Sequence, residues 1–294
     1  MLIKKLIFSI LIITSFLACK DAKTQEVTEE STEIEQVIKP EIKLYTFDGG
    51  SIGVNNLNLF AQGDTYKGDS LQLGNAFYVV KHPKGVLLWD TGLPEGLIGN
   101  PAYTTPDGAF TISRKDSISN QLTSIGITND QVDYIAFSHI HFDHTGAANN
   151  FSDALWLVQT PEYEYAKGEE IKSNGFYAPD SFNALSNVKK LNGDHDVFGD
   201  GSVIIKSLPG HTPGHQVLFV DLPNHGPTLL SGDMYHFAKN RKDKVIPQFN
   251  HDIPLSEKSM ELFEQYAKEK NAKVYIQHEL SDFSKMPKAP QFLN

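Results

Sequence analysis

Three histidines and an aspartate lie within six positions of SHIHFDHTG, residues 138–146, and no other feature of the sequence constrains the fold as strongly. The stretch follows a strand-like run, VDYIAF. On an extended backbone, His139 and His141 point to the same side. Asp143 and His144 come next, where the chain can turn into a helix, so their side chains can approach a neighbouring position. The spacing therefore offers ligands for two adjacent metal ions.

An ordinary polar loop is the alternative, because a single histidine is more often a core or surface residue than a metal ligand. Clustered imidazoles without a cation would lose free energy through unsatisfied nitrogens, so metal binding is the preferred interpretation. Further ligands should then lie at the ends of later strands, and His211, Asp233 and His278 each follow a strand-like run. Four other histidines lie in turn-like or polar segments and are predicted to be at the surface: His82, His195, His225 and His251.

Apolar runs rich in β-branched and aromatic residues predict strands along the whole chain. The runs cover residues 43–47, 75–80, 85–92, 132–139, 154–160, 201–208, 215–222, 227–234 and 272–278. Residues 81–85 are turn-forming, which predicts a hairpin between the second and third runs. Two strand-rich halves that each carry helices suggest two sheets packed face to face with helices outside.

The helical segments are shorter and fewer. Residues 117–124 have apolar side chains at helical spacing, with Asp116 or Ser117 as the cap, and residues 161–167 predict a short helix. Ser256 is expected to cap a helix over residues 257–270. The predicted buried face of that helix consists of Met260, Leu262, Phe263 and Tyr266. Two segments without clear periodicity are candidates for loops over the site, residues 168–185 and 234–252.

The N-terminal residues predict export. Residues 1–19 combine two lysines with an apolar run that is too short to span a bilayer, as in a signal peptide. FLAC resembles the processing site of bacterial lipoproteins, so Cys19 is expected to carry lipid in the cell envelope, in the periplasm or at the outer membrane. Phe16 departs from that pattern, and simple secretion is the alternative. Residues 20–40 are too polar to offset their ordering entropy and predict a disordered tether before the folded domain, residues 41–294.

Charge and cysteine content narrow the possible partners and ligands. The formal net charge of -10 and the lack of clustered Lys and Arg argue against a nucleic-acid partner. Cys19 is the single cysteine of the sequence. Once it is removed or lipidated, no thiolate ligand is available, and any metal must rest on histidines and carboxylates.

Four segments together resemble the motifs of the metallo-β-lactamase superfamily: LLWDTG, SHIHFDH, GHTPGH and SGDM. The resemblance extends over nearly all of residues 41–294 and implies an α/β fold, an αββα sandwich with the site at one edge between the sheets. It implies two Zn²⁺ ions, the first bound by His139, His141 and His211 and the second by Asp143, His144 and His278, with Asp233 bridging them. Iron, cobalt or manganese could occupy similar sites. Asp90 and His215 are expected to support ligands, or only to cap a turn and to pack.

Within the superfamily, the sequence resembles N-acyl-homoserine lactonases most. This implies an enzyme that opens the lactone ring of acyl-homoserine lactones, and so silences quorum signalling, by attack of a metal-bound hydroxide. Asp143 is the expected proton shuttle. Many of these lactonases contact the substrate carbonyl through a tyrosine three residues after the bridging aspartate. That position is His236 here, with Tyr235 one place earlier, so His236 is favoured over Tyr235, and packing is the alternative for both.

Other substrates and roles stay open. Four aromatic residues of the loops are candidates to line an acyl-chain pocket, or simply to pack: Phe176, Tyr177, Phe182 and Phe237. The same metals could serve a thioester hydrolase similar to glyoxalase II, or a phosphodiester hydrolase. A metal-binding envelope lipoprotein without activity is a third hypothesis, which the complete ligand set and Asp143 disfavour.

Overall fold

The computed structural model describes residues 40–294. The predicted export signal, residues 1–19, and the predicted tether up to residue 39 lie outside the described residues. Between residues 40 and 294, no helix combines the length and the apolar character that crossing a membrane would require.

Thirteen strands of the described chain form two sheets. In spatial order, the eight-stranded sheet contains β4 (Tyr103–Thr104), β5 (Phe110–Ser113), β1 (Lys43–Val54), β2 (Leu71–His82), β3 (Gly85–Trp89), β6 (Tyr134–Ala136), β7 (Leu155–Gln159) and β8 (Val188–Leu191). The five-stranded sheet contains β13 (Lys273–Tyr275), β12 (Gly226–Leu230), β11 (Gln216–Leu222), β10 (Val203–Ser207) and β9 (His195–Asp196).

Helices connect and cover these strands. The α-helices are α1 (Ile118–Thr123), α2 (Phe142–Thr145), α3 (Thr160–Tyr165), α4 (Glu170–Ser173), α5 (Ala238–Asp243), α6 (Ile253–Glu269) and α7 (Leu280–Lys285). The 3-10 turns are η1 (Leu57–Phe60), η2 (Glu95–Leu97), η3 (Asn129–Gln131), η4 (Ala148–Phe151), η5 (Pro179–Ser181) and η6 (Gly232–Met234).

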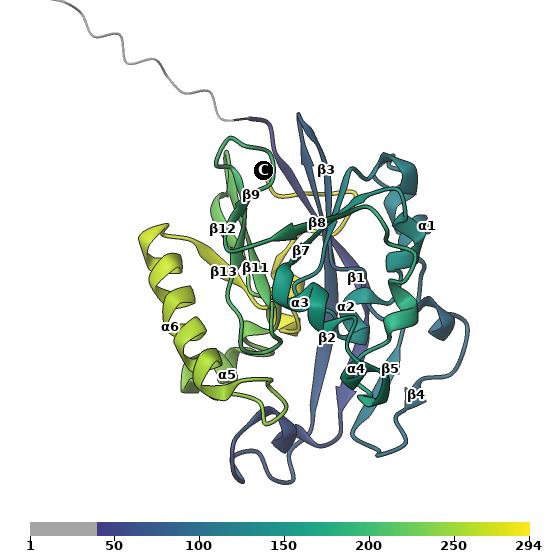
Figure 1. Ribbon diagram of the computed structural model, residues 1–294, viewed down its shortest axis with the longest axis vertical. Helices are drawn as coiled ribbons and strands as arrows, with labels where there is room; N and C mark the ends of the chain where they lie inside the picture. Colours follow the sequence, from purple (N-terminus) through teal and green to yellow (C-terminus); the bar gives the residue numbers. More distant parts are fainter. Residues whose placement is uncertain (1–39) are drawn as a thin grey trace, which may run out of the picture. The chain divides into compact units, whose positions relative to one another are not determined.

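The two sheets pack face to face, and helices lie on both outer faces. Trp89 of the large sheet and Leu218 of the small sheet belong to one buried cluster between the sheets. Ile118 of α1 packs in a second cluster on the other side of the large sheet. Phe263 of α6 packs with Phe219 on the outside of the small sheet, and Figure 1 shows α5 and α6 on that side. The predicted αββα sandwich is therefore confirmed.

Strand direction brings the polar segments to one edge. The predicted hairpin is confirmed, with Tyr78 of β2 opposite Trp89 of β3. Strands β3 and β6 are parallel, as are β12 and β13. Parallel strands end at the same edge of a sheet, so Asp90 after β3 lies beside the end of β6, where its N–H donates to Ala136 O at 2.9 Å. His139 follows at the same edge.

Helix α6 begins earlier than predicted. Asp252 is the cap, because its side chain accepts from Leu255 N at 2.8 Å, and Pro254 lies in the first turn. Aspartate at the cap and proline in the first turn are the favoured arrangement, so the prediction of Ser256 as cap is wrong. Ser256 is instead buried within the helix. Leu262 is also misassigned, because its side chain is 46% exposed.

Other predictions missed short elements. Each of two strands has only two residues, β4 and β9, and such strands carry no readable periodicity. The segments predicted as loops contain α4, η5 and α5. His82 is buried rather than at the surface, because its ring stacks on Phe198 with centroids 4.2 Å apart.

Helix α2 is pressed against the turn that follows β3. Thr91 N donates to His144 O at 2.7 Å, and Gly146 N donates to Gly92 O at 2.9 Å. A Cβ atom added at Gly146 would clash with the backbone of Leu93. The glycine is therefore required for the close approach that holds α2 in place.

Replacing Gly146 with alanine should destabilise the protein by about 1–3 kcal/mol, because overpacking forces the backbone to shift. The free energy of unfolding in guanidinium chloride of the metal-free protein measures this effect. Gly96→Ala is the matched control, since a Cβ there meets nothing within 4 Å. Equal stability of the two variants would contradict the packing argument.

Candidate metal centre

Three imidazoles from two loops form the first group of ligands. His139 and His141 lie between β6 and α2, and His211 lies between β10 and β11. His139 Nε2 lies 2.8 Å from His141 Nδ1 and 3.2 Å from His211 Nε2. His141 Nδ1 and His211 Nε2 are 3.3 Å apart. Zinc bonds of about 2.0–2.1 Å in tetrahedral geometry place ligand nitrogens about 3.3 Å apart. The three side chains thus fit around one cation.

Asp143, His144 and His278 form the second group. Asp143 and His144 belong to α2, and His278 follows β13. Asp143 Oδ2 lies 3.5 Å from the Nε2 atoms of both histidines. All three residues are buried. The structure therefore brings together all the residues that the sequence predicts for this ion.

Asp233 lies between the two groups and presents one oxygen to each. Oδ1 is 3.0 Å from His278 Nε2 and 3.4 Å from His144 Nε2. Oδ2 is 3.5 Å from His211 Nε2 and 3.7 Å from His139 Nε2. These contacts are short but lack hydrogen-bond geometry, so within residues 40–294 Asp233 Oδ1 and His144 Nε2 are buried without a hydrogen-bond partner. Buried acceptors without donors are what a pair of divalent cations would satisfy, so the donor set fits two ions.

Burial keeps the first group of imidazoles neutral. It lowers the pKa of His141 to about 3 and, with neighbouring imidazoles, lowers the pKa of His139 and His211 well below the usual value. Asp233 responds in the opposite way. Burial disfavours its charge, but the surrounding imidazoles, His278 first, hold its pKa well below the usual range. Neutral nitrogens in the first group and an ionised Asp233 are the protonation states that metal binding requires. In the second group the nearby carboxylates outweigh burial and raise the pKa of both His144 and His278, so a cation there would displace protons.

Asp90 orients His144. The carboxylate accepts from Ser138 N at 2.7 Å, and its Oδ2 lies 3.2 Å from His144 Nδ1. Gln277 Nε2 donates to the same Oδ2 at 2.9 Å. The aspartate holds a φ of 60°, a region that aspartate tolerates better than most residues. Because Nδ1 faces Asp90, Nε2 of His144 is left to face the centre.

His215 supports Asp233 rather than a metal. Its Nδ1 donates to Leu208 O at 3.0 Å, so the Nε2 atom accepts from Asp233 N, also at 3.0 Å. Both ring nitrogens are therefore occupied by the protein. Gly232 is required here, because a Cβ at that position would lie 2.8 Å from His215 Nε2.

Three amide side chains complete the support, and sequence reasoning missed them. Asn250 Oδ1 accepts from His211 Nδ1 at 2.9 Å, and Asn75 Nδ2 donates to Asp143 O at 2.8 Å. Gln277, which precedes a predicted ligand, also donates to the backbone of β2. Isolated amides belong to no motif and follow no periodicity, so the sequence carried no signal for Asn75 or Asn250.

An apolar pocket adjoins the centre. Its polar wall consists of His141, Asp143, Asp233, His236 and His278. Its apolar wall consists of Ile52, Phe60, Leu73, Phe110, Phe142, Phe176 and Phe249. Phe176 is the member that the sequence predicted. Phe182 instead packs on Trp156 in the core, and Phe237 packs on Tyr66. Tyr177 packs on His141 with ring centroids 4.8 Å apart.

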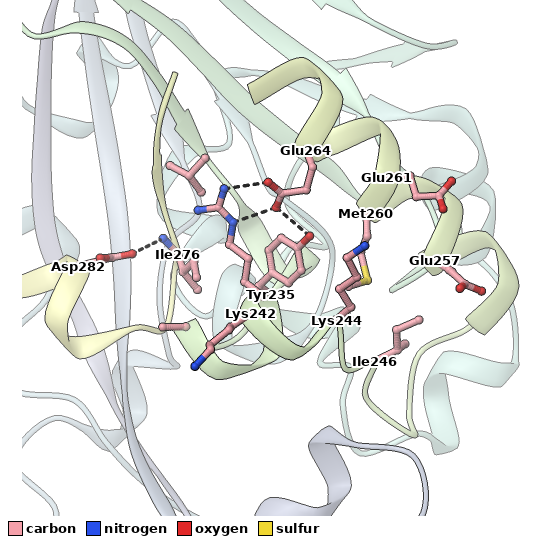
Figure 2. Close-up of a pocket in the computed structure, with 13 residues that line it drawn as sticks. Tyr235, Lys242, Lys244, Ile246, Glu257, Met260, Glu261, Glu264, Ile276 and Asp282 are labelled. Atoms are coloured by element: carbon pink, nitrogen blue, oxygen red, sulfur yellow. Dashed lines mark hydrogen bonds and ion pairs between the residues drawn. The ribbon is translucent and has the colours of Figure 1, made fainter. Parts of the chain in front are cut away.

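His236 and Tyr235 point in different directions. His236 is buried beside the centre, with its Nε2 3.0 Å from Asp233 Oδ2. The Tyr235 hydroxyl donates instead to Glu264 of α6 at 3.0 Å, as Figure 2 shows. The ring lines a separate cavity of about 770 Å³. Arg241 pairs with Glu264 there. The structure therefore brings His236 to the centre and places Tyr235 outside it, because adjacent residues of an extended segment face opposite sides.

The fold and the motifs also match known proteins. Residues 71–278 match the family described as the metallo-beta-lactamase superfamily. The N-acyl homoserine lactonase AttM of Rhizobium radiobacter is 31% identical over 267 residues, covering 86% of this chain and 98% of the relative. The N-acyl homoserine lactonase AiiA of Bacillus thuringiensis subsp. kurstaki is 29% identical over 221 residues, covering 74% and 85%. A solved N-acyl homoserine lactone hydrolase, with N-hexanoyl-L-homoserine at its catalytic metal centre, has a TM-score of 0.75 at 27% identity and covers 85% and 98%.

Removing divalent metal with a chelator should lower Tm by about 5–10 °C. One ion at a hundred times its Kd stabilises the folded state by about 2.7 kcal/mol, and a domain of this size gains about 2–4 °C per kcal/mol. Thermal unfolding with chelator and with added Zn²⁺ measures the shift. The His195→Ala variant, changed on β9, should show the full fall in Tm on chelation, whereas Asp233→Ala should lose most of that fall. An unchanged Tm on chelation would contradict the assignment of a metal centre.

Proposed function

The chain belongs to the metallo-β-lactamase superfamily and is a metal-dependent hydrolase, and from this we propose that it opens the ring of N-acyl-homoserine lactones with two zinc ions. The product would be the ring-opened N-acyl-homoserine, so the activity would silence quorum signalling. The observation that carries the proposal is Asp233, which presents one oxygen to each ligand group directly beside an apolar pocket.

The lining of the pocket supports a substrate with an acyl chain, which would displace side chains on entering because the cavity volume is about 40 Å³. Its wall holds five phenylalanines and two aliphatic residues, and none of the residues that line it is a lysine or an arginine. Apolar walls with a few polar groups at one end are typical of sites for small amphipathic ligands. A phosphodiester would gain less from this wall, because phosphate recognition usually draws on cationic side chains. Both relatives named above are N-acyl homoserine lactonases, which supports the same substrate class.

The chemistry would divide between the ions and the chain. When bound, divalent cations supply Lewis acidity, which activates water and polarises a carbonyl group. Asp143 lines the pocket within reach of both histidines of its group, where it can take a proton from the attacking water. The water oxygen bonds to the carbonyl carbon and the ring C–O bond breaks. Asp143 then returns the proton to the former ring oxygen, which leaves as a hydroxyl group.

His236 is the group that we assign to the substrate carbonyl. Its ring lines the pocket and packs edge-on against Phe60, with centroids 4.8 Å apart. Its Nε2 lies 3.0 Å from Asp233 Oδ2, so the ring presents its Nε2–H group to the centre. A hydrogen-bond donor at this position would stabilise the negative charge that develops on the carbonyl oxygen.

Export is a separate proposal, which rests on the signal-like residues 1–19 and on FLAC. We propose that the enzyme is secreted or attached to the cell envelope through lipidated Cys19. An exported enzyme would meet diffusible acyl lactones outside the cytoplasm.

Purified protein with two zinc ions should convert N-hexanoyl-L-homoserine lactone to its open acid, detected by mass spectrometry. Asp143→Asn should lower kcat by about 10²–10⁴-fold, because it removes the proton shuttle. Asp130→Asn, which changes an exposed aspartate of η3, should leave kcat unchanged.

A panel of lactones, glutathione thioesters and phosphodiesters decides the substrate class. Thioester turnover that exceeds lactone turnover by orders of magnitude would reject the lactonase assignment.

His236→Phe should lower kcat for the lactone by about 10²-fold, because the donor to the carbonyl is lost while the ring is kept. His236→Tyr should retain most of the activity, since a tyrosine hydroxyl also donates. Tyr235→Phe is the matched control: it should cost about 1 kcal/mol of stability through the lost bond to Glu264 and leave kcat unchanged. A larger fall in kcat for Tyr235→Phe than for His236→Phe would reverse the assignment.

A further inference from the structure

Glu162 is a buried carboxylate that neither the ligand groups nor the pocket includes. It belongs to α3, in the segment PEYEYAK, and its side chain is 2% exposed. Burial raises its pKa to about 7, against the lowering effect of backbone N–H donors. A charge is costly to hold at such a position unless its donors are well placed.

The two oxygens of Glu162 accept from two different ligand loops. Oε1 accepts from Ile140 N at 3.0 Å, and Ile140 lies between His139 and His141. Oε2 accepts from Gly214 N at 2.7 Å, three residues after His211. A single carboxylate thus connects both loops that supply the first ligand group.

The contact is close and distinct from the other links between the loops. A Cβ at Gly214 would lie 2.6 Å from Glu162 Cβ, so only glycine lets this loop approach α3. Gln216 N also donates to Ser138 O at 2.8 Å, but that bond joins the bases of the loops, where β11 begins and β6 has just ended. Glu162 instead contacts the loop backbone beside the ligands, at Ile140 and Gly214.

We propose that Glu162 is a positioning residue that sets the metal affinity of the group formed by His139, His141 and His211. The three nitrogens come from two loops and must stay about 3.3 Å apart to bind one ion in tetrahedral geometry. Glu162 is bonded to both loops, whereas Asp143, His144 and His278 lie on α2 and after β13. Its loss should therefore weaken the first group selectively. The inference rests on the proposed two-metal centre and not on the choice of substrate.

Zinc affinities of Glu162→Gln, measured by competition with a chromophoric chelator, test the proposal. The amide keeps the shape of the side chain but presents an NH₂ group to one backbone N–H, so one of the two bonds is lost. One binding step should weaken by about 10–100-fold, as is typical when a group that supports a ligand is removed. The other step should keep the wild-type affinity. His211→Ala and His278→Ala, each lacking one ligand group's histidine, show which step belongs to which group.

Glu164→Gln is the matched control on the same helix. Glu164 is exposed and pairs with Lys190 at 2.7 Å, so both zinc affinities should match the wild type. Wild-type affinities in Glu162→Gln, or equal weakening of both steps, would overturn the proposal, since equal weakening indicates a general loss of structure.

If Glu162→Gln does not fold, Gly214→Ala decides, because its Cβ would push the His211 loop away from α3 and should weaken the same step alone. The titration needs no substrate. An enzyme that binds two zinc ions but leaves lactones intact would therefore reject the proposed function and leave this test in force.

Discussion

One buried carboxylate between two groups of imidazoles is the constraint on which the rest of the structure depends. Asp233 is buried among the ligand histidines, which hold its pKa well below the usual range against the effect of burial, and it directs one oxygen to each group. Such a charge is unfavourable in a desolvated site unless cations compensate it. The centre therefore specifies a pair of metal ions, and the surrounding protein must deliver seven side chains from separate segments to within bonding distance of them.

The strand topology positions these side chains. The parallel strands of the large sheet bring Asp90 and the SHIHFDHTG segment to one edge. In the small sheet, β12 and β13 run parallel, and the segments after them carry Asp233 and His278. The two sheets pack through one apolar cluster, so the two edges meet where the ligands lie. The sandwich core thus positions the chemistry without contributing a ligand.

Hydrogen bonds then orient the ligand side chains that the strand topology brings to one edge. Asp90, Asn250 and the carbonyl of Gly74 each take the outward nitrogen of one ligand histidine. Glu162 acts one step further out, on the backbone of two loops. Because these three ligand rings each have one nitrogen held by the protein, the other nitrogen is directed at the centre with little entropy left to lose.

The sequence by itself determined the donor atoms, their order along the chain and the sandwich, because ligand spacing and strand periodicity are local properties. The start of α6 was predicted one turn too late, because Asp252 as the cap and Pro254 in the first turn were not recognised as a helix start. Only the tertiary structure shows that His236 faces the centre and Tyr235 faces Glu264, because their opposite directions depend on the backbone after η6 and on a distant helix. It alone assigned Asn75, Asn250 and Glu162, whose partners lie between 22 and 68 residues away and follow from packing rather than from any pattern.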